Sequence, residues 1–467
     1  MAWGVVRVLR NRDAAFYLGG VVVSGFGDSA MSLAAGIWVK ALSGSDSLAA
    51  FTGFCVWFPT LTGPLIGAVA DRFPRRRLLV GTNLALAAAL TTPLVLHSSR
   101  QIWLLFAVLI LVGTGAVLTE SAETALMTSA VPDELRGDLN GLVRTAVESM
   151  KLLAPLAGAG LFSALGGSAV ALLDSITFLF AAAAFVCVRV RRREPAPKLR
   201  QNGSWRKDAV AGGRFLWRQR LLRKLVVAGG TAMAASSLSS TATFALLDTG
   251  LHRPPTFAGA LLWAQGLGSV LIGIAAGAFL RRIPERVFAA AGLSVFAIGI
   301  LARTTPWLPV VLIGHVAIGL GLPCPLVASV TALQRQTPNE LLGRVTATAN
   351  TLMFAPTGLA LLLGTGMVAL LDYRVQLCVA GVLALAATVF LARMSCPDFR
   401  RVRDRVIKRS VGLAPVSPST PVRTRRVAGS RGRSGVVHRC TTRPTGRRPA
   451  RLRRSPATGP DARSVRP

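Results

Sequence analysis

Residues 102–119 read IWLLFAVLILVGTGAVLT, a run without a charged side chain. A helix that crosses the hydrocarbon core of a bilayer needs about 20 mostly apolar residues, so this run predicts a transmembrane helix. Comparable runs recur along the chain, which is 52% apolar and only 16% charged, against roughly 25% in soluble domains. The first run lacks a small-residue cleavage site after a short core, so we expect it to be retained. The sequence therefore predicts a polytopic membrane protein.

The apolar runs predict an all-α fold with twelve transmembrane helices. Helices are favoured over barrel strands because the runs are continuous and do not alternate with polar residues. The expected spans are 16–39, 47–70, 78–97, 102–126, 141–163, 167–189, 223–247, 257–280, 287–303, 307–333, 345–370 and 374–395.

The distribution of Lys and Arg predicts the orientation of these spans. If the N-terminus is cytoplasmic, basic residues crowd the inside segments, above all 189–224. The outside ends then carry only Lys40, Arg100, Arg253, Arg303 and Arg374. Because cytoplasmic loops are enriched in Lys and Arg, we expect both termini in the cytoplasm of a bacterial inner membrane.

The net charge of +34 resembles that of nucleic-acid-binding proteins, but much of it lies after the last apolar run. Residues 396–467 are rich in Arg, Pro, Ser, Thr and Gly, a composition that predicts a disordered cytoplasmic tail. We expect the basic loops and tail to bind anionic lipid, not nucleic acid, and a tail without function is the alternative. The six cysteines are scattered without disulfide or metal spacing, so we expect neither metal nor cofactor.

An internal repeat divides the chain into two halves. TALMTSAVPDELRG at 124–137 is echoed by TALQRQTPNELLG at 331–343, and GPLIGAVADRFPRRR at 63–77 by GIAAGAFLRRIPER at 273–286. The repeat predicts two pseudo-symmetric six-helix bundles with a site at their interface. The expected segments are an N-terminus at 1–15, bundles at 16–189 and 223–395, and between them a cytoplasmic loop with an amphipathic helix at 190–222.

The segment GAVADRFPRRR at 67–77 resembles the signature loop of the major facilitator superfamily. LRNRDAAFYLGGVVVSGFGDSAMSLAAGIWVKALSGS near the N-terminus and VPDELRGDLNGLVRTAVESMKLLAPLAGAGL at 131–161 look like its macrolide-efflux and enterobactin-exporter branch. The resemblance covers residues 7–395. It implies the major facilitator fold, export of small molecules and a proton gradient as the energy source.

The same resemblance assigns two groups of motif residues. The signature loop implies a conformational latch at the cytoplasmic mouth, formed by Gly67, Asp71, Arg72 and Arg76. The antiporter motif of the fifth span is present in degenerate form, with Pro155 and Gly158. The arginine that drug–proton antiporters often carry early in the fourth span is absent, since 102–119 is uncharged.

Charged residues inside the predicted spans are candidates for proton coupling or substrate binding, because each costs roughly 2.5–3.5 kcal/mol to insert. Asp28 lies in the middle of the first span among small residues, where a carboxyl group could take up a proton or bind a cationic substrate; a structural hydrogen bond is the alternative. The other candidates are Glu120, Glu148, Lys151 and His315. For Glu120, Glu148 and Lys151, pairing between the fourth and fifth spans would form a gate or proton relay, and snorkelling helix ends are the alternative. Silent packing is the alternative for His315. Asp174 and Asp248 are expected at the outer interface.

These features predict a monomeric secondary transporter that exports a hydrophobic or amphipathic small molecule by alternating access, coupled to protons. An importer or facilitator on the same fold is the first alternative. A receptor or scaffold without transport is the second. No nucleophile–base motif, phosphate loop or metal cluster is found in the sequence, so an enzyme is not expected.

Overall fold

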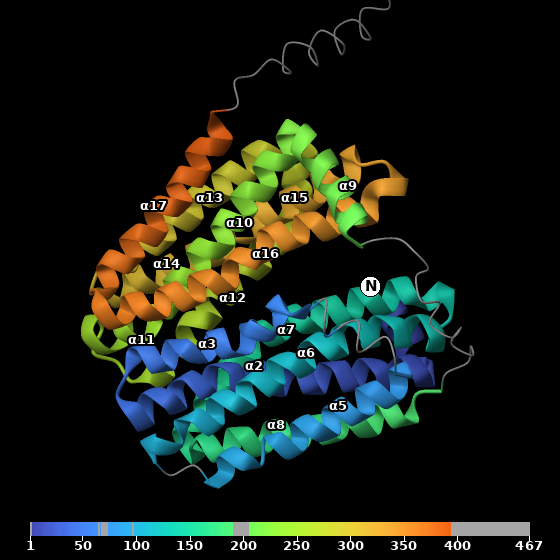
Figure 1. The fold of residues 1–467 in the computed structure, drawn as a ribbon, viewed down its shortest axis with the longest axis horizontal. Coiled ribbons are helices and arrows are strands. Elements are labelled where there is room, and N and C mark those ends of the chain that lie inside the picture. Colours follow the sequence, from blue (N-terminus) through green and yellow to red (C-terminus); the bar gives the residue numbers. More distant parts are fainter. Residues whose placement is uncertain (1, 64–65, 67–72, 96–97, 190–204, 394–467) are drawn as a thin grey trace, which may run out of the picture. The chain divides into compact units, whose positions relative to one another are not determined.

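The computed structural model describes residues 2–63, 66, 73–95, 98–189 and 205–393. All regular elements in these ranges are helical (Figure 1). The N-terminal half contains α1 (Ala2–Arg10), α2 (Arg12–Ser43), α3 (Asp46–Leu61), α5 (Arg75–Ala89), η1 (Thr92–Val95), η2 (Ser99–Gln101), α6 (Ile102–Ala130), α7 (Asp133–Leu165) and α8 (Gly167–Cys187).

The C-terminal half begins with the predicted amphipathic helix, here α9 (Trp205–Arg218). The remaining elements are α10 (Arg220–Thr241), α11 (Thr243–Ala245), the π-helical η3 (Leu246–Gly250), η4 (Pro255–Phe257), α12 (Ala258–Arg282), α13 (Glu285–Ala302), α14 (Leu308–Gly321), α15 (Pro323–Gln336), α16 (Asn339–Leu370) and α17 (Tyr373–Ala392). The tenth predicted span is therefore two helices, α14 and α15, which meet at Leu322.

Within the described ranges, nine helical stretches are long and apolar enough to cross a membrane. The second, fifth and seventh predicted spans are not among them, although α3, α7 and α10 occupy these positions as helices. The reasons are visible in their sequences. The described part of the second span, α3, has 16 residues, because 64–65 and 67–72 lie outside the described ranges, while α7 carries charged side chains through its first half and α10 begins with basic residues and ends in serines.

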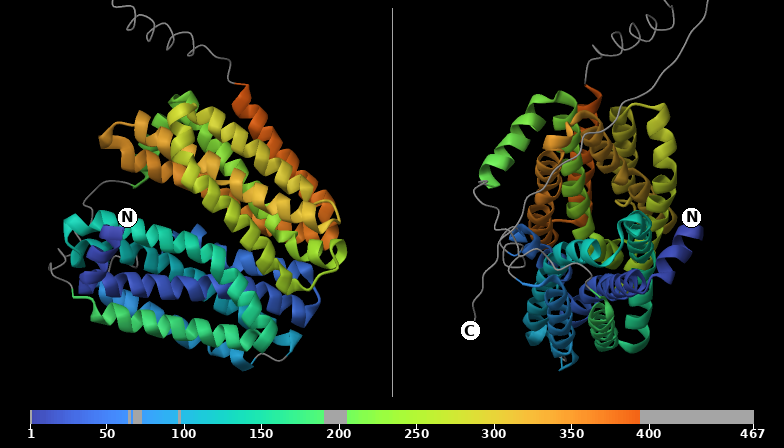
Figure 2. Two further views of the ribbon diagram at one scale, coloured as in Figure 1. Left: turned by 180° about the vertical axis from the view of Figure 1, so that it is seen from behind. Right: turned by 90° about the vertical axis from the view of Figure 1, so that its right-hand side faces the viewer.

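The two halves repeat one packing scheme. In the N-terminal half, α2 packs on α7 and α8, and α5 packs on α6 and α8. In the C-terminal half, α10 packs on α16 and α17, and α13 packs on α14 and α17. Figures 1 and 2 show the helices from α2 (blue) to α8 (green) in one bundle and those from α10 (yellow-green) to α17 (orange) in another. The predicted pair of pseudo-symmetric helical bundles is confirmed.

The prolines of the sequence repeat explain why equivalent helices begin at equivalent places. Pro132 and Pro338 are the N-caps of α7 and α16, and Pro74 and Pro284 are the N-caps of α5 and α13. A proline is accommodated at a helix start because the first backbone N–H groups have no partner within the helix. The repeat therefore encodes four helix starts.

Close helix packing depends on small residues, as is usual between membrane helices. A Cβ added at Gly158 of α7 would lie 2.6 Å from the carbonyl oxygen of Ala30 in α2. In the C-terminal half, Gly268 of α12 lies directly against the backbone of α14 at Val316. These positions let neighbouring backbones touch.

Candidate functional site

A cavity of about 450 Å³ lies between the two halves. Its walls come from α2, α3 and α7 on one side and from α10, α11, α12 and α16 on the other. Apolar walls are formed by Leu33, Phe244, Leu262 and Leu361, while hydroxyl groups are contributed by Ser29, Ser32, Thr52, Ser240, Thr241 and Thr243. Ligand sites are commonly mostly apolar with a few placed polar groups, and this central cavity has that character.

Asp28 and Lys151 are the charged residues in the lining of the central cavity. Asp28 lies near the middle of α2, as the sequence predicts. Its Oδ1 atom is buried and has no hydrogen-bond partner within the described part of the chain. An unpaired buried acceptor is costly, and an ionised one is more so.

Asp174 of α8 is a second buried acid in the same region. The sequence placed it at the outer interface, and this prediction is wrong: its exposed fraction is 0%. Its Oδ1 accepts a hydrogen bond from Thr177 at 3.2 Å, while its Oδ2 has no partner. Gly27, which precedes Asp28, lies directly against this carboxylate, and the two acids repel each other when both are ionised. The N-terminal bundle thus holds two acids close together.

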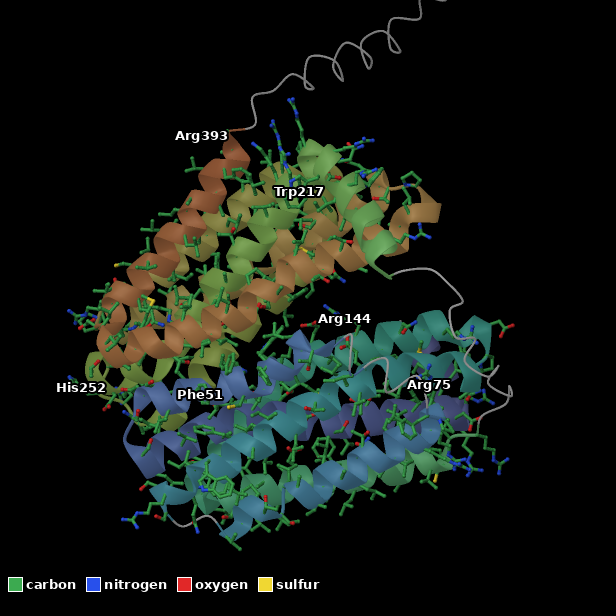
Figure 3. The ribbon with its side chains drawn as sticks, in the orientation of Figure 1. Phe51, Arg75, Arg144, Trp217, His252 and Arg393 are labelled. Atoms are coloured by element: carbon green, nitrogen blue, oxygen red, sulfur yellow. The ribbon has the colours of Figure 1, made fainter. Side chains whose placement is uncertain are left out.

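The charged stripe of α7 is paired along its own helix. The guanidinium of Arg144 lies 3.0 Å from Glu148 Oε1, and the amine of Lys151 lies 3.3 Å from the same oxygen. Both basic side chains are exposed, and Figure 3 shows Arg144 on α7. These pairs follow the i,i+3 and i,i+4 spacing within α7, and the pairing between the fourth and fifth spans stays a prediction.

A second cavity, of about 170 Å³, lies inside the N-terminal bundle. It is lined from five helices, α2, α5, α6, α7 and α8, and we call it the N-bundle cavity. Glu120 and Glu123 line it near the C-terminal end of α6, and Asp28 lines it at the other side. Of the lining residues that the structure describes, Asp28 is the one found in both cavities.

The remaining intramembrane candidates have different surroundings. His315 of α14 is buried in the C-terminal half, and its Nδ1 lies 2.9 Å from the carbonyl oxygen of Val311. It is not among the residues that line the two cavities. Pro155 of α7 lines the central cavity, and Gly158 packs against α2. The motif of the fifth span therefore shapes the cavity wall.

The latch predicted at the cytoplasmic mouth is described only in part. Gly67, Asp71 and Arg72 lie outside the described residues, as do segment 190–204 and the tail from 394 onward. Arg76, at the start of α5, donates hydrogen bonds to the carbonyl oxygens of Phe185 and Val186 at the end of α8. These bonds join two helices of the same bundle.

Arg303 is a buried cation, although the sequence analysis placed it at the outer end of a span. Its exposed fraction is 3%, and its guanidinium donates to Ser239 Oγ at 2.5 Å and to Thr243 Oγ1 at 3.0 Å. These partners flank Ala242, where α10 ends and α11 begins, and Thr243 also lines the central cavity. Arg303 therefore supports the cavity wall at a break in the helix.

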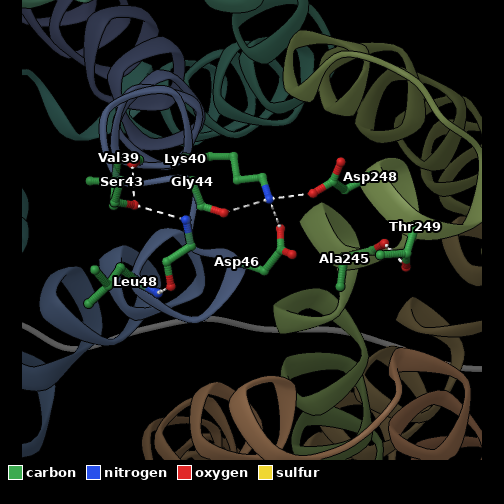
Figure 4. A network of polar contacts seen from close by, with 10 residues as sticks. Val39, Lys40, Ser43, Gly44, Asp46, Leu48, Ala245, Asp248 and Thr249 are labelled. Carbon is green, nitrogen blue, oxygen red and sulfur yellow. Dashed lines mark hydrogen bonds and ion pairs between the residues drawn. The ribbon is translucent and has the colours of Figure 1, made fainter.

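An ion pair joins the two halves at the end predicted to face outward (Figure 4). Lys40 Nζ lies 2.6 Å from Asp248 Oδ2 in the other half, 2.9 Å from Asp46 Oδ1, and 3.0 Å from the carbonyl oxygen of Gly44. We call these contacts the outer clamp. Asp248, expected at the interface, is 58% exposed at its side chain, but it is also a bridge between the bundles.

Further contacts close the same end. Ser47 Oγ of α3 donates to the carbonyl oxygen of Thr365 in α16 at 3.0 Å. Gly259, at the start of α12, packs against Ala159 near the end of α7. Neither the clamp nor these contacts has a local sequence signal, because the partners are far apart in the chain.

The family model of the Major Facilitator Superfamily matches this sequence at residues 17–252 and 225–431. Together with the paired helical bundles and the cavity between them, this shows that the chain belongs to that superfamily. It is a membrane transport protein and not an enzyme.

Curated relatives match over short segments. "Macrolide efflux protein A" of Streptococcus pyogenes is 25% identical over 31% of this chain and 36% of its own length. "Multidrug resistance protein B homolog" of Mycobacterium tuberculosis is 32% identical over 25% of this chain and 24% of its own length. The matched segments thus span about a third or less of these relatives.

Solved structures share the fold at low sequence identity. A bacterial homologue of the iron transporter ferroportin, in an inward-facing state, has a TM-score of 0.62 and 17% identity over 83% of this chain and 98% of its own. A D-xylose-proton symporter has a TM-score of 0.61 and 14% identity over 83% and 98%. These similarities support the fold alone.

Proposed function

We propose that this protein exports hydrophobic or amphipathic small molecules across the bacterial cell membrane in exchange for protons, by alternating access. The observation that carries the proposal is Asp28, an acid with an unpartnered oxygen in the wall of a cavity between the two bundles. A carboxyl group at this depth is expensive unless it is neutralised. A proton or a cationic group of the substrate can neutralise it, and competition between the two couples their movements.

The substrate class follows from the cavity. Its volume is typical of sites for small molecules, and its walls combine leucine and phenylalanine side chains with hydroxyl groups. Such a surface suits an amphipathic molecule. The relatives named for macrolide efflux and multidrug resistance support macrolide-like compounds as the first substrates to test.

The outer clamp supports the alternating-access part of the proposal. Lys40 and Asp248 belong to different halves, so their ion pair must break when the halves separate at this end. The contacts at this end support a state that is closed toward the outside, and in this state we infer that the central cavity is loaded from the cytoplasm. Rocking of one bundle against the other is the established motion for repeats of this kind.

Transport by the purified protein in proteoliposomes tests the proposal. Radiolabelled erythromycin serves as the macrolide, and ethidium as an amphipathic cation. For inside-out protein, we expect accumulation in the lumen when the lumen is acidic and none when the gradient is collapsed. Accumulation driven by the opposite gradient would indicate an importer, and no gradient-dependent movement of either compound would contradict the proposal.

A further inference from the structure

Asp28 borders the N-bundle cavity as well as the central cavity. Among the described residues, those that line this cavity and those that line the central cavity have only Asp28 in common, so the carboxyl group forms part of the wall between them. A substrate in the central cavity covers Asp28 from the interface between the halves. The face toward the N-bundle cavity stays open.

The N-bundle cavity is suited to hold water. Its volume of about 170 Å³ has room for several water molecules, each of which occupies about 30 Å³ in the liquid. Water also needs polar partners, and these are present along the lining: Ser24, Asn83, Thr119, Glu120 and Glu123. They lead from Asp28 near the middle of α2 toward the C-terminal end of α6, which is the predicted cytoplasmic end.

The buried acids supply independent support for a proton-exchanging site. Asp28 Oδ1 and Asp174 Oδ2 are both buried without partners. Two neighbouring carboxylates repel each other when both are ionised, and neither of these oxygens has a hydrogen-bond partner among the described residues to offset that repulsion. The charged groups that surround Asp28 on the packed helices are Asp174 on α8, Lys151 on α7, and Glu120 and Glu123 on α6, while α5 and α3 contribute the uncharged Asn83 and Thr52.

We propose that the N-bundle cavity is a proton route between Asp28 and the cytoplasm that is separate from the substrate pathway. The inference rests on the proposed function and adds the route by which the proton leaves. When substrate enters the central cavity, the O–H bond of the protonated Asp28 breaks and an O–H bond forms on water in the N-bundle cavity. The electron pair stays on the carboxylate. Substrate and departing proton therefore do not block each other.

The route is tested by plugging each cavity and following Asp28 directly. Gly53→Trp fills the central cavity, where a Cβ at Gly53 meets only Leu361, at 3.7 Å. Ala116→Phe fills the N-bundle cavity from α6. The size controls are Gly53→Ala and Ala116→Ser. Time-resolved infrared spectroscopy after a pH jump reports the carboxyl band that is lost in Asp28→Asn, in purified protein checked for folding by gel filtration and circular dichroism.

We expect the Asp28 band of Gly53→Trp to respond at a rate within threefold of that of the unplugged protein. In the double variant Gly53→Trp/Ala116→Phe, the band should respond at least tenfold more slowly. An equally slow response in Gly53→Trp alone would place the route in the central cavity and overturn the inference. A fast response in the double variant, or a band that never responds in the unplugged protein, would also overturn it. The measurement uses no substrate, so its failure is distinct from a failure of transport.

Discussion

Asp248→Asn should shift the protein toward the state that is open at the outer end. The substitution keeps the size of the side chain and removes the charge that faces Lys40 across the two halves. Asp46→Asn is the matched control, because it removes a charge from the same lysine but leaves the link between the halves intact.

The size of the shift follows from the exposure of the two partners. Lys40 is 9% exposed at its side chain and Asp248 is 58% exposed, so solvent screens the pair from one side. Exposed ion pairs contribute about 0.2–1 kcal/mol, and the buried lysine places this pair at the upper end of that range. A loss of about 1 kcal/mol raises the ratio of outer-open to outer-closed protein about fivefold.

Distances between spin labels report this ratio. Leu165 and Trp307 are exposed positions at the outer ends of the two halves, and cysteines placed there in a background without native cysteines accept the labels. We expect the ratio of the longer-distance to the shorter-distance population to grow about fivefold in Asp248→Asn and to stay near its original value in Asp46→Asn. Equal shifts in the two variants, or none in Asp248→Asn, would refute the clamp.

Two further substitutions, Gly158→Ala and Arg76→Ala, each with a matched control, test the packing of the N-terminal bundle by thermal unfolding in detergent. Gly158→Ala should lower the free energy of unfolding by about 1–3 kcal/mol, because the new methyl group meets the carbonyl oxygen of Ala30. Gly160→Ala should leave it unchanged or raise it slightly, since no described atom lies within 4 Å of the added Cβ. Arg76→Ala should lower the free energy of unfolding by about 1 kcal/mol, because the hydrogen bonds of Arg76 to the end of α8 are lost. Arg77→Ala, at an exposed position, should change it by less than about 0.5 kcal/mol. Equal melting temperatures within either pair would contradict the packing described.

The fold and its repeat could be predicted from the sequence because their signals are local. Apolar runs identify helices, and the prolines at 74, 132, 284 and 338 identify helix starts in both halves. The depth of Asp28 is also local information, since it depends only on its distance from the ends of one span. These features needed no knowledge of which helices are neighbours.

The partners of the charged residues could not be predicted in this way. Asp174 lies only a short distance from the end of α8, yet it is buried because that face of the helix packs on Gly27. Lys40 and Asp248 lie 208 positions apart in the chain, and Arg303 bonds to Ser239 and Thr243 on either side of the point where α10 ends and α11 begins, which apolar patterning does not show. Each of these contacts depends on tertiary packing, which periodicity leaves undetermined.

The most direct test of the central claim is transport by Asp28→Asn in proteoliposomes, with and without a pH gradient. Asparagine keeps the shape and hydrogen-bonding capacity of the side chain but cannot exchange a proton. We predict a folded, inserted protein in which export is lost or continues at a rate that no longer depends on the gradient. Normal accumulation of substrate with unchanged dependence on the pH gradient would contradict the account.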